Sequence, residues 1–270
     1  MISVLQHLLT PLKTPQQKLN RLREYTQALL LKMIEKHGDM KNLVFVGGTA
    51  LRIVYGISRY SEDLDFSWIG SHPLQFKSIV SFLERELRLA GFEVIFTSKE
   101  TRIVHSCFIK FSGLLYALGL STTKSRHFSV KLEIDTNPPQ RYVLQTSNIN
   151  QDFFFQTQHH DLSTLCAGKC CAILCRPYAK GRDFYDLLWL MAKKIHPNYR
   201  FLSEAYTQIT QKKILFNHEL LKDKLTIKLR EVDFKKIHSD VLPFLMDPDE
   251  LKYLTADSLI ELTAQWLTPS

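Results

Sequence analysis

Two spacings of apolar residues occur in the first half of the chain, and each predicts a kind of secondary structure. In residues 16–37 the apolar side chains return every three or four positions, which predicts a helix that ends at Gly38. Shorter apolar runs and apolar–polar alternation follow, and both patterns are typical of strands. We predict strands over residues 43–46, 63–68, 92–97, 104–111 and 128–135, and helices over residues 49–55 and 74–90.

Helical spacing dominates the second half of the chain, from about Ser163 onward. A mixed sheet followed by helices predicts an α+β protein with a helical C-terminal region. We expect one domain over residues 1–150 and a helical domain over residues 151–270 that completes the functional site, with the boundary within residues 137–162. The predicted helices lie near residues 163–175, 182–195, 201–213, 218–230 and 256–267.

The composition is that of a folded globular protein, since the 270 residues are 45% hydrophobic and 23% charged. The formal net charge of +8 favours polyanionic partners such as nucleotides or nucleic acid. No apolar run reaches about 18 residues, so we predict no membrane span. The N-terminal residues lack the basic and apolar segments of a signal peptide, and we expect a cytoplasmic location.

Four of the five cysteines, Cys166, Cys170, Cys171 and Cys175, lie within one predicted helix. Their spacing lacks the Cys-x-x-Cys pairs of a zinc ribbon. We therefore interpret them as small buried residues rather than as a metal or redox site. The odd total agrees with a reducing compartment, where thiols stay free.

Two carboxylates, Asp63 and Asp65, stand two positions apart in a predicted strand. Residues i and i+2 of a strand project from the same face, about 6.5 Å apart at the backbone. Carboxylate oxygens are the ligands that Mg²⁺ prefers, and two such ions about 4 Å apart activate a hydroxyl and stabilise a leaving pyrophosphate. An isolated Asp-x-Asp pattern is common on charged surfaces. Its interpretation as a metal site therefore depends on the neighbouring residues.

About a dozen residues before this pair, the chain reads Gly47-Gly48-Thr49 between a predicted strand and a predicted helix. Glycines let the backbone approach a phosphate closely, and a helix N-terminus attracts anions. Thr49 either caps the helix or holds a phosphate oxygen. The combination of the glycine turn with Asp63 and Asp65 predicts a site for phosphate and metal.

A third acid is expected on a neighbouring strand, and residues 130–135 offer two candidates. Alternation places Lys131, Glu133 and Asp135 on one face, with apolar residues on the other. Glu133 lies in mid-strand between apolar residues, and we favour it. Asp135 is the alternative, although its place at the strand end also suits capping of the following turn.

Several segments resemble the AbiEii/MenT nucleotidyltransferases, which belong to the DNA polymerase β-like superfamily. The resemblance begins in Val46–Arg52 and Arg59–Phe66, and continues in Lys131–Ile134, Leu165–Lys169 and Arg176–Leu187. It covers about residues 40–190 in the family's order. It implies a polymerase β-like sheet core and transfer of a nucleoside monophosphate from an NTP, with Mg²⁺ or Mn²⁺.

The resemblance also implies roles for individual residues. The family's members are commonly toxins of bacterial toxin–antitoxin systems, which suggests a tRNA 3′ end as acceptor and a cognate antitoxin as partner. The alternatives are protein AMPylation, nucleotide transfer to a small molecule, a phosphotransferase, and a non-catalytic module that binds nucleotide, RNA or a partner protein. The implied catalytic residues are Asp63, Asp65, Glu133, Lys169 and Asp186, and the implied nucleotide-binding residues are Gly47, Gly48, Thr49, Arg59, Lys131, Lys180, Arg182 and Asp183.

Three other features receive weaker interpretations. We interpret His159-His160-Asp161 as a polar loop rather than a metal site, and Phe153-Phe154-Phe155 as core or interface. Basic segments at Lys212-Lys213, Lys222–Arg230 and Lys235-Lys236 suit either an RNA backbone or solvated helix faces, and the sequence does not choose between them.

Overall fold

The computed structural model describes residues 2–267 and divides into two compact units. The sheet unit comprises the chain up to Val54 together with Tyr60–Pro138 and Thr146–His159. The helical unit comprises Tyr55–Arg59, Pro139–Gln145 and the chain from His160 onward. Two short segments that precede residue 150 therefore belong to the helical unit.

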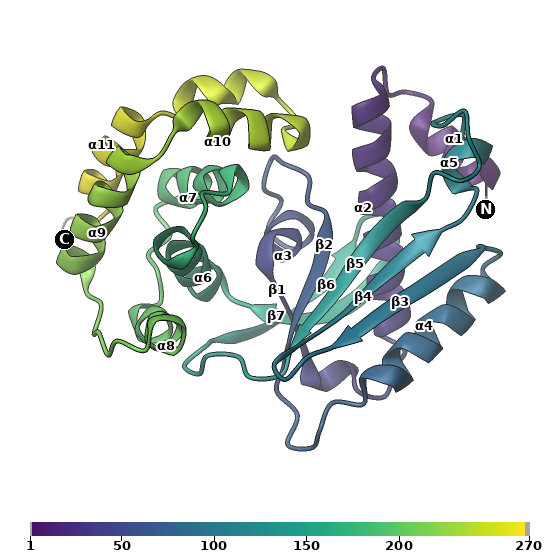
Figure 1. Ribbon diagram of the computed structural model, residues 1–270, viewed down its shortest axis with the longest axis horizontal. Coiled ribbons are helices and arrows are strands. Elements are labelled where there is room, and N and C mark those ends of the chain that lie inside the picture. Colours follow the sequence, from purple (N-terminus) through teal and green to yellow (C-terminus); the bar gives the residue numbers. More distant parts are fainter. Residues whose placement is uncertain (1, 268–270) are drawn as a thin grey trace. The chain divides into compact units, whose positions relative to one another are not determined.

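A seven-stranded mixed sheet forms the sheet unit, in the order β3-β4-β5-β2-β1-β7-β6 (Figure 1). Strand β1 pairs antiparallel with β2 and parallel with β7, while β2 and β5 are parallel. Strand β4 is antiparallel to both β3 and β5. The prediction of an α+β protein with a mixed sheet is confirmed. The strands are β1 (Leu43–Val46), β2 (Asp63–Trp68), β3 (Val94–Glu100), β4 (Val104–Phe111), β5 (Phe128–Asp135), β6 (Leu144–Asn150) and β7 (Phe154–His160).

Strand β5 shows why the central strands form where they do. Its burial alternates along all eight residues, with Val130, Leu132 and Ile134 buried on one face. Lys131 and Glu133 lie on the other face and stay partly exposed. Because burial has a period of two, the pattern also fixes which side chains face the polar side.

Helices pack against the sheet through apolar stripes. Helix α2 begins at a capping box in which Thr14 and Gln17 satisfy each other's backbone N–H groups, and it contacts both α4 and β5. Helix α4 buries Ile79, Leu83 and Leu87, one side of the helix, and also contacts β3. The helical segments of this unit are α1 (Ile2–Leu9), α2 (Pro15–Ile34), η1 (Met40–Asn42), α3 (Gly47–Ile53), α4 (Phe76–Leu89) and α5 (Leu114–Ala117).

In the helical unit, α6 and α7 pack against each other and the other helices surround them (Figure 1). Helix α6 contacts α8 and α9, and α7 contacts α10 and α11. Asp161 caps α6 by accepting from the backbone N–H of Thr164. The segments are α6 (Leu162–Cys175), α7 (Gly181–Ala192), α8 (Tyr199–Thr210), α9 (His218–Glu231), α10 (Phe234–Val241), η2 (Leu242–Phe244), η3 (Pro248–Tyr253) and α11 (Ala256–Trp266).

The structure corrects two expectations about β7 and the segment around it. The polar-loop interpretation of residues 159–161 is wrong, because His159 and His160 are buried in β7. His159 Nε2 lies 2.9 Å from the hydroxyl of Ser147. Strands β6 and β7 were not predicted, since their many Gln, Asn, Thr and Ser residues hide the apolar signal.

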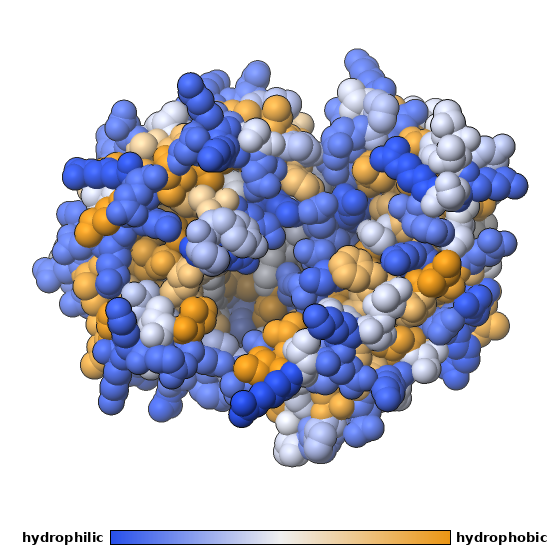
Figure 2. Space-filling model, viewed as in Figure 1, coloured by the Kyte–Doolittle hydropathy of each residue, from blue (hydrophilic) through white to orange (hydrophobic). Residues whose placement is uncertain are grey.

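Hydrophilic side chains cover much of the visible surface, and hydrophobic residues occur between them in separate groups (Figure 2). Within residues 2–267, no helix combines the length and the apolar character needed to cross a bilayer.

Candidate active site

The predicted acids lie on the polar face of two paired strands in the sheet unit. In the parallel pairing of β2 with β5, Asp65 stands opposite Glu133 and Asp63 stands opposite Lys131. Directly opposed residues of paired strands share a face, at Cβ separations of about 5 Å. We call Asp63, Asp65 and Glu133 the acidic cluster, and all three are partly exposed.

The pKa of Lys131 depends on all three carboxylates. Its ammonium lies 2.8 Å from Oε1 of Glu133. Burial opposes the charged form, but the hydrogen bond to Glu133 and the charges of Glu133, Asp63 and Asp65 outweigh it and raise the pKa of Lys131. The acidic cluster thus already stabilises a cation, in the form of an ammonium group.

The acidic cluster fits a divalent cation by the chemistry of its donors. Its oxygens are carboxylates, which hard cations prefer, and their charges reach the position of a cation at Lys131. Among residues 2–267, no three His, Cys, Asp or Glu side chains stand close enough together to make a ready metal centre. A metal that binds here would therefore compete with Lys131 for Glu133.

Two features require a glycine at position 47, namely the backbone conformation there and the nearby side chain of Asp65. Gly47 has a φ of +78°, in the left-handed region, and a Cβ built on it would lie 2.5 Å from Oδ2 of Asp65. Helix α3 begins here, with Val46 as its N-cap, rather than at Thr49 as predicted. Thr49 is fully buried and its hydroxyl donates to the carbonyl of Asp63. Its side chain therefore ties α3 to β2 instead of capping the helix.

We expect Gly47→Ala to destabilise the protein and to displace the Asp65 carboxylate. The left-handed backbone alone costs an L-residue about 1–2 kcal/mol, and the new methyl group forces the Asp65 side chain to rotate. Gly56→Ala is the matched control, because Gly56 has a φ of +73° and no atom within 4 Å of its added Cβ. Urea denaturation should show a larger loss for Gly47→Ala, and equal losses would contradict the predicted contact.

Asp135, the alternative third acid, is engaged elsewhere. Its Oδ1 accepts from the backbone N–H of Asn137 at 2.9 Å, within the turn that follows β5. Burial raises the pKa of Asp135, and the hydrogen bond from Asn137 partly opposes this. We therefore keep Glu133 as the third acid of the proposal.

A second group of charges occupies the helical unit. Both oxygens of Asp186 accept from Arg59, at 2.5 and 2.6 Å, and Oδ2 also lies 2.7 Å from the ammonium of Lys169. Asp183 contacts Lys169 at 2.9 Å and Arg176 at 2.8 Å. With Lys180 and Arg182, which follow Arg176 along the chain, we call these residues the basic cluster. It contains Arg59, Lys169, Arg176, Lys180, Arg182, Asp183 and Asp186.

The pKa values of Asp183 and Lys180 reflect the excess of positive charge in the basic cluster. Burial disfavours the Asp183 carboxylate, but Lys169 and Arg176 outweigh this and lower its pKa. The pKa of Lys180 is also lowered, by burial first and then by the charges of Arg182 and Arg176. A lysine whose charge is disfavoured by neighbouring cations gains from any anion that binds beside it.

Comparisons with known proteins identify the family and the fold of the chain. The family described as "Nucleotidyl transferase AbiEii toxin, Type IV TA system" matches residues 28–256. The chain belongs to the AbiEii family. The JHP933 protein of Helicobacter pylori has a similar fold, with 20% identity, a TM-score of 0.53 and coverage of 92% of this chain and 91% of that one. An H. pylori structure described as a candidate nucleotidyltransferase is also similar, with 20% identity and a TM-score of 0.52. The match covers 91% of this chain and 93% of that one. No curated protein matches the sequence.

The site residues that the resemblance to the AbiEii family implies differ in their exposure to solvent. Arg59 and Asp186 are 1% and 0% exposed, and each satisfies the other. Asp186 also lies 2.7 Å from the ammonium of Lys169. Arg182 is also largely buried, and its guanidinium lies 4.1 Å from the ring centroid of Phe244. Lys180 and Lys169 are partly exposed.

Sequence reasoning missed two buried polar residues of α2. Gln27 of α2 is 1% exposed, and its side-chain amide donates to the carbonyl of Ser61 at 3.2 Å. Buried Glu24 on the same helix accepts from Arg52 at 2.5 Å. Polar residues inside an otherwise apolar helical stripe were the available signal, since such groups are buried only with partners.

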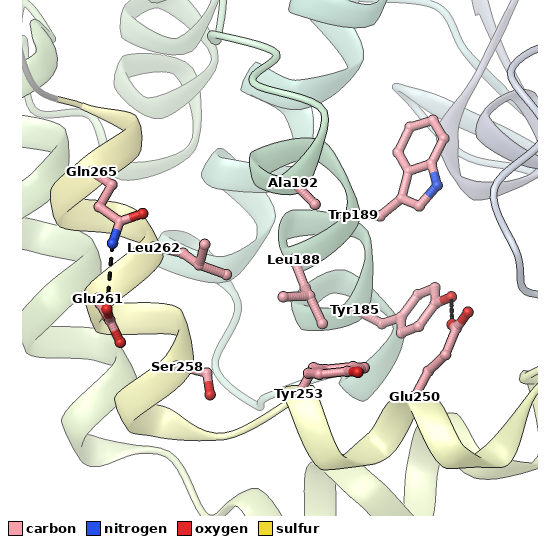
Figure 3. Close-up of a pocket in the computed structure, with 10 residues that line it drawn as sticks. All are labelled: Tyr185, Leu188, Trp189, Ala192, Glu250, Tyr253, Ser258, Glu261, Leu262 and Gln265. Carbon is pink, nitrogen blue, oxygen red and sulfur yellow. Dashed lines mark hydrogen bonds between the residues drawn. The ribbon is translucent and has the colours of Figure 1, made fainter.

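A pocket of about 510 Å³ lies elsewhere in the helical unit, between α7, η3 and α11 (Figure 3). The hydroxyl of Tyr185 donates to Glu250 at one side of the pocket. Its ten lining residues include the carboxylates of Glu250 and Glu261 but no lysine or arginine. A triphosphate would be repelled there, so the size of the pocket does not make it the nucleotide site of this AbiEii protein.

Proposed function

We propose that the chain is a metal-dependent nucleotidyltransferase that moves a nucleoside monophosphate from an NTP to RNA, with a tRNA 3′ end as acceptor. We further propose that it acts as the toxin of a toxin–antitoxin pair and has a cognate antitoxin. One observation carries the catalytic part of the proposal. It is the register that places Asp65 opposite Glu133, with Asp63 on the same face and Gly47 against Asp65.

The acidic cluster holds the metal in this proposal. Bound Mg²⁺ or Mn²⁺ would supply a Lewis acid for the acceptor hydroxyl and for the leaving pyrophosphate. Asp63 and Asp65 provide ligands from one strand, and Glu133 provides the third from the neighbouring strand. Gly47 leaves room for the Asp65 carboxylate, and Thr49 fixes the backbone of Asp63. Lys131 balances the charge of Glu133 until a metal replaces it.

The basic cluster neutralises the triphosphate. Lys180 and Arg182 lie at the start of α7, where the helix dipole also favours an anion. Arg176 is 36% exposed at its side chain and can add a bidentate contact. Lys169 stays paired with Asp183 and Asp186 and adds charge from below the surface. Catalysis of this kind depends on positioning and charge stabilisation rather than on a protein nucleophile.

The acceptor is tested by labelling. The net charge of +8 supports RNA, because a basic protein attracts a phosphate backbone. The experiment incubates the protein with each α-labelled NTP, Mg²⁺ and either total RNA or total protein. We expect label in the tRNA fraction and release of pyrophosphate. Label in protein alone would replace the RNA acceptor with AMPylation. Release of a nucleoside diphosphate would indicate a phosphotransferase, and binding without turnover would indicate a non-catalytic module.

We expect Lys180→Met to stabilise the free protein and to weaken NTP binding. The change removes one of several neighbouring cations, so repulsion falls when no anion is present. It also removes a contact to phosphate, which should reduce affinity about tenfold. Thermal denaturation with and without NTP measures both effects, and Lys252→Met, an exposed lysine of η3, is the control. A Lys180→Met protein that binds NTP as well as the wild type would remove Lys180 from the site.

A further inference from the structure

Helix α6 ends in a pair of cysteines that differs from the other thiols of the chain. Cys166 and Cys170 are fully buried, as expected for packing residues. Cys175 is partly exposed, and its Sγ lies 3.8 Å from Sγ of Cys171. The interpretation of all four as inert core residues therefore holds less well at this end of the helix.

The two thiols of the pair have different surroundings, since Cys171 is buried and Cys175 is partly exposed. The hydrogen bond with Cys171 lowers the pKa of Cys175, burial opposes this, and the ammonium of Lys224 on α9 adds to the lowering. The same hydrogen bond and burial raise the pKa of Cys171. Cys175 is accordingly the more nucleophilic thiol, and Cys171 is placed to attack it once it is oxidised.

Closure of a disulfide here would change the helix end. The Cβ atoms of residues i and i+4 in a helix lie about 5–6 Å apart, whereas a disulfide needs about 3.5–4.5 Å. The last turn must therefore shift, which is local because α6 ends at Cys175 and Arg176 is already extended. Arg176 follows directly and lies 2.8 Å from Asp183 of the basic cluster.

We propose that Cys171 and Cys175 form a reversible, peroxide-sensitive disulfide that draws Arg176 away from Asp183 and so weakens the basic cluster. The Cys175 thiolate attacks one oxygen of a hydroperoxide, which breaks the O–O bond and gives a sulfenic acid and water or an alcohol. The Cys171 sulfur then displaces the sulfenic oxygen, forming the S–S bond and releasing water. The two thiols are oxidised together and the peroxide is reduced. The effect on NTP binding rests on the proposed function, whereas the disulfide itself does not.

The first experiment maps the bond. The reduced protein is treated with a small excess of hydrogen peroxide, alkylated and digested with trypsin, which releases residues 170–180 as one peptide because Arg176 precedes proline. We expect this peptide to lose two hydrogens and to carry one alkylated thiol, at Cys170. Cys170→Ser should still form the bond, and Cys171→Ser should instead accumulate a sulfenic acid at Cys175 that dimedone traps. Three alkylated thiols in the treated wild type would overturn the proposal, as would a bond to Cys170.

The second experiment measures the consequence. We expect faster hydrogen exchange in residues 172–180 after oxidation and recovery with a thiol reductant. NTP affinity should fall about tenfold, the scale of one charged hydrogen bond, with no change in peroxide-treated Cys175→Ser. If exchange changes but the reduced protein binds no NTP, the proposed function fails and the disulfide stands. If the bond forms and neither exchange nor affinity changes, the link to Arg176 is wrong.

Discussion

Asp65→Asn should reduce nucleotide transfer about a thousandfold while leaving the protein folded. The substitution keeps the shape of the side chain and removes the charge that would bind a divalent cation. Asp65 stands opposite Glu133 and against Gly47, so no neighbouring carboxylate can take its place without moving β2. Loss of one stabilising interaction at a reacting centre costs about 10²–10³ in rate, and a metal ligand belongs at the upper end.

Label transfer from α-labelled NTP measures this effect, with urea denaturation as the check on folding. Asp63→Asn should behave in the same way, because Asp63 lies on the same face two residues earlier. Glu100→Gln is the matched control, since its side chain is 41% exposed at the end of β3 and pairs with His105 at 3.5 Å. Transfer that survives in an Asp63→Ala, Asp65→Ala double mutant would exclude the acidic cluster as the metal site.

The acidic cluster was largely predictable because strand periodicity is local. Alternation of apolar residues in β2 and β5 assigns Asp63, Asp65 and Glu133 to the polar faces of their strands. The sequence does not contain the parallel register of the two strands, which depends on the whole sheet. It also does not reveal that Lys131 bridges to Glu133, since that contact depends on rotamers within the pair.

The basic cluster was predictable only in part. Helical spacing indicates that Asp183 and Asp186 share a face of α7. The burial of Asp186 was not foreseeable, because its main partner Arg59 is 127 residues away in the sequence. The resemblance to the family names both residues but does not distinguish a side chain that touches substrate from one that holds Lys169 in place. The burial of Arg59 and Asp186 favours the second of these roles.

Asp186→Asn should lower the free energy of unfolding by about 3–5 kcal/mol, the typical cost of removing one partner from a buried ion pair. The carboxylate is 0% exposed and serves both Arg59, at 1%, and Lys169, at 13%. Asparagine has nearly the same volume, so packing is preserved and the loss reports on charge. Lys169 would then depend on Asp183, which already holds Arg176.

Urea denaturation tests this expectation against a surface pair. Glu204→Gln breaks the ion pair between Glu204 and Arg141, whose side chains are 40% and 67% exposed. It should lower the free energy of unfolding by less than about 1 kcal/mol. A double variant, Arg59→Met with Asp186→Leu, should recover most of the stability, because it replaces a buried pair with apolar groups of similar size. If Asp186→Asn is as stable as Glu204→Gln, then water reaches Asp186 and the buried network described here is wrong. A third outcome is that Asp186→Asn is unstable, whereas the double variant regains its stability but does not bind NTP. In that case Asp186 and Arg59 position Lys169 for the nucleotide, in addition to stabilising the fold.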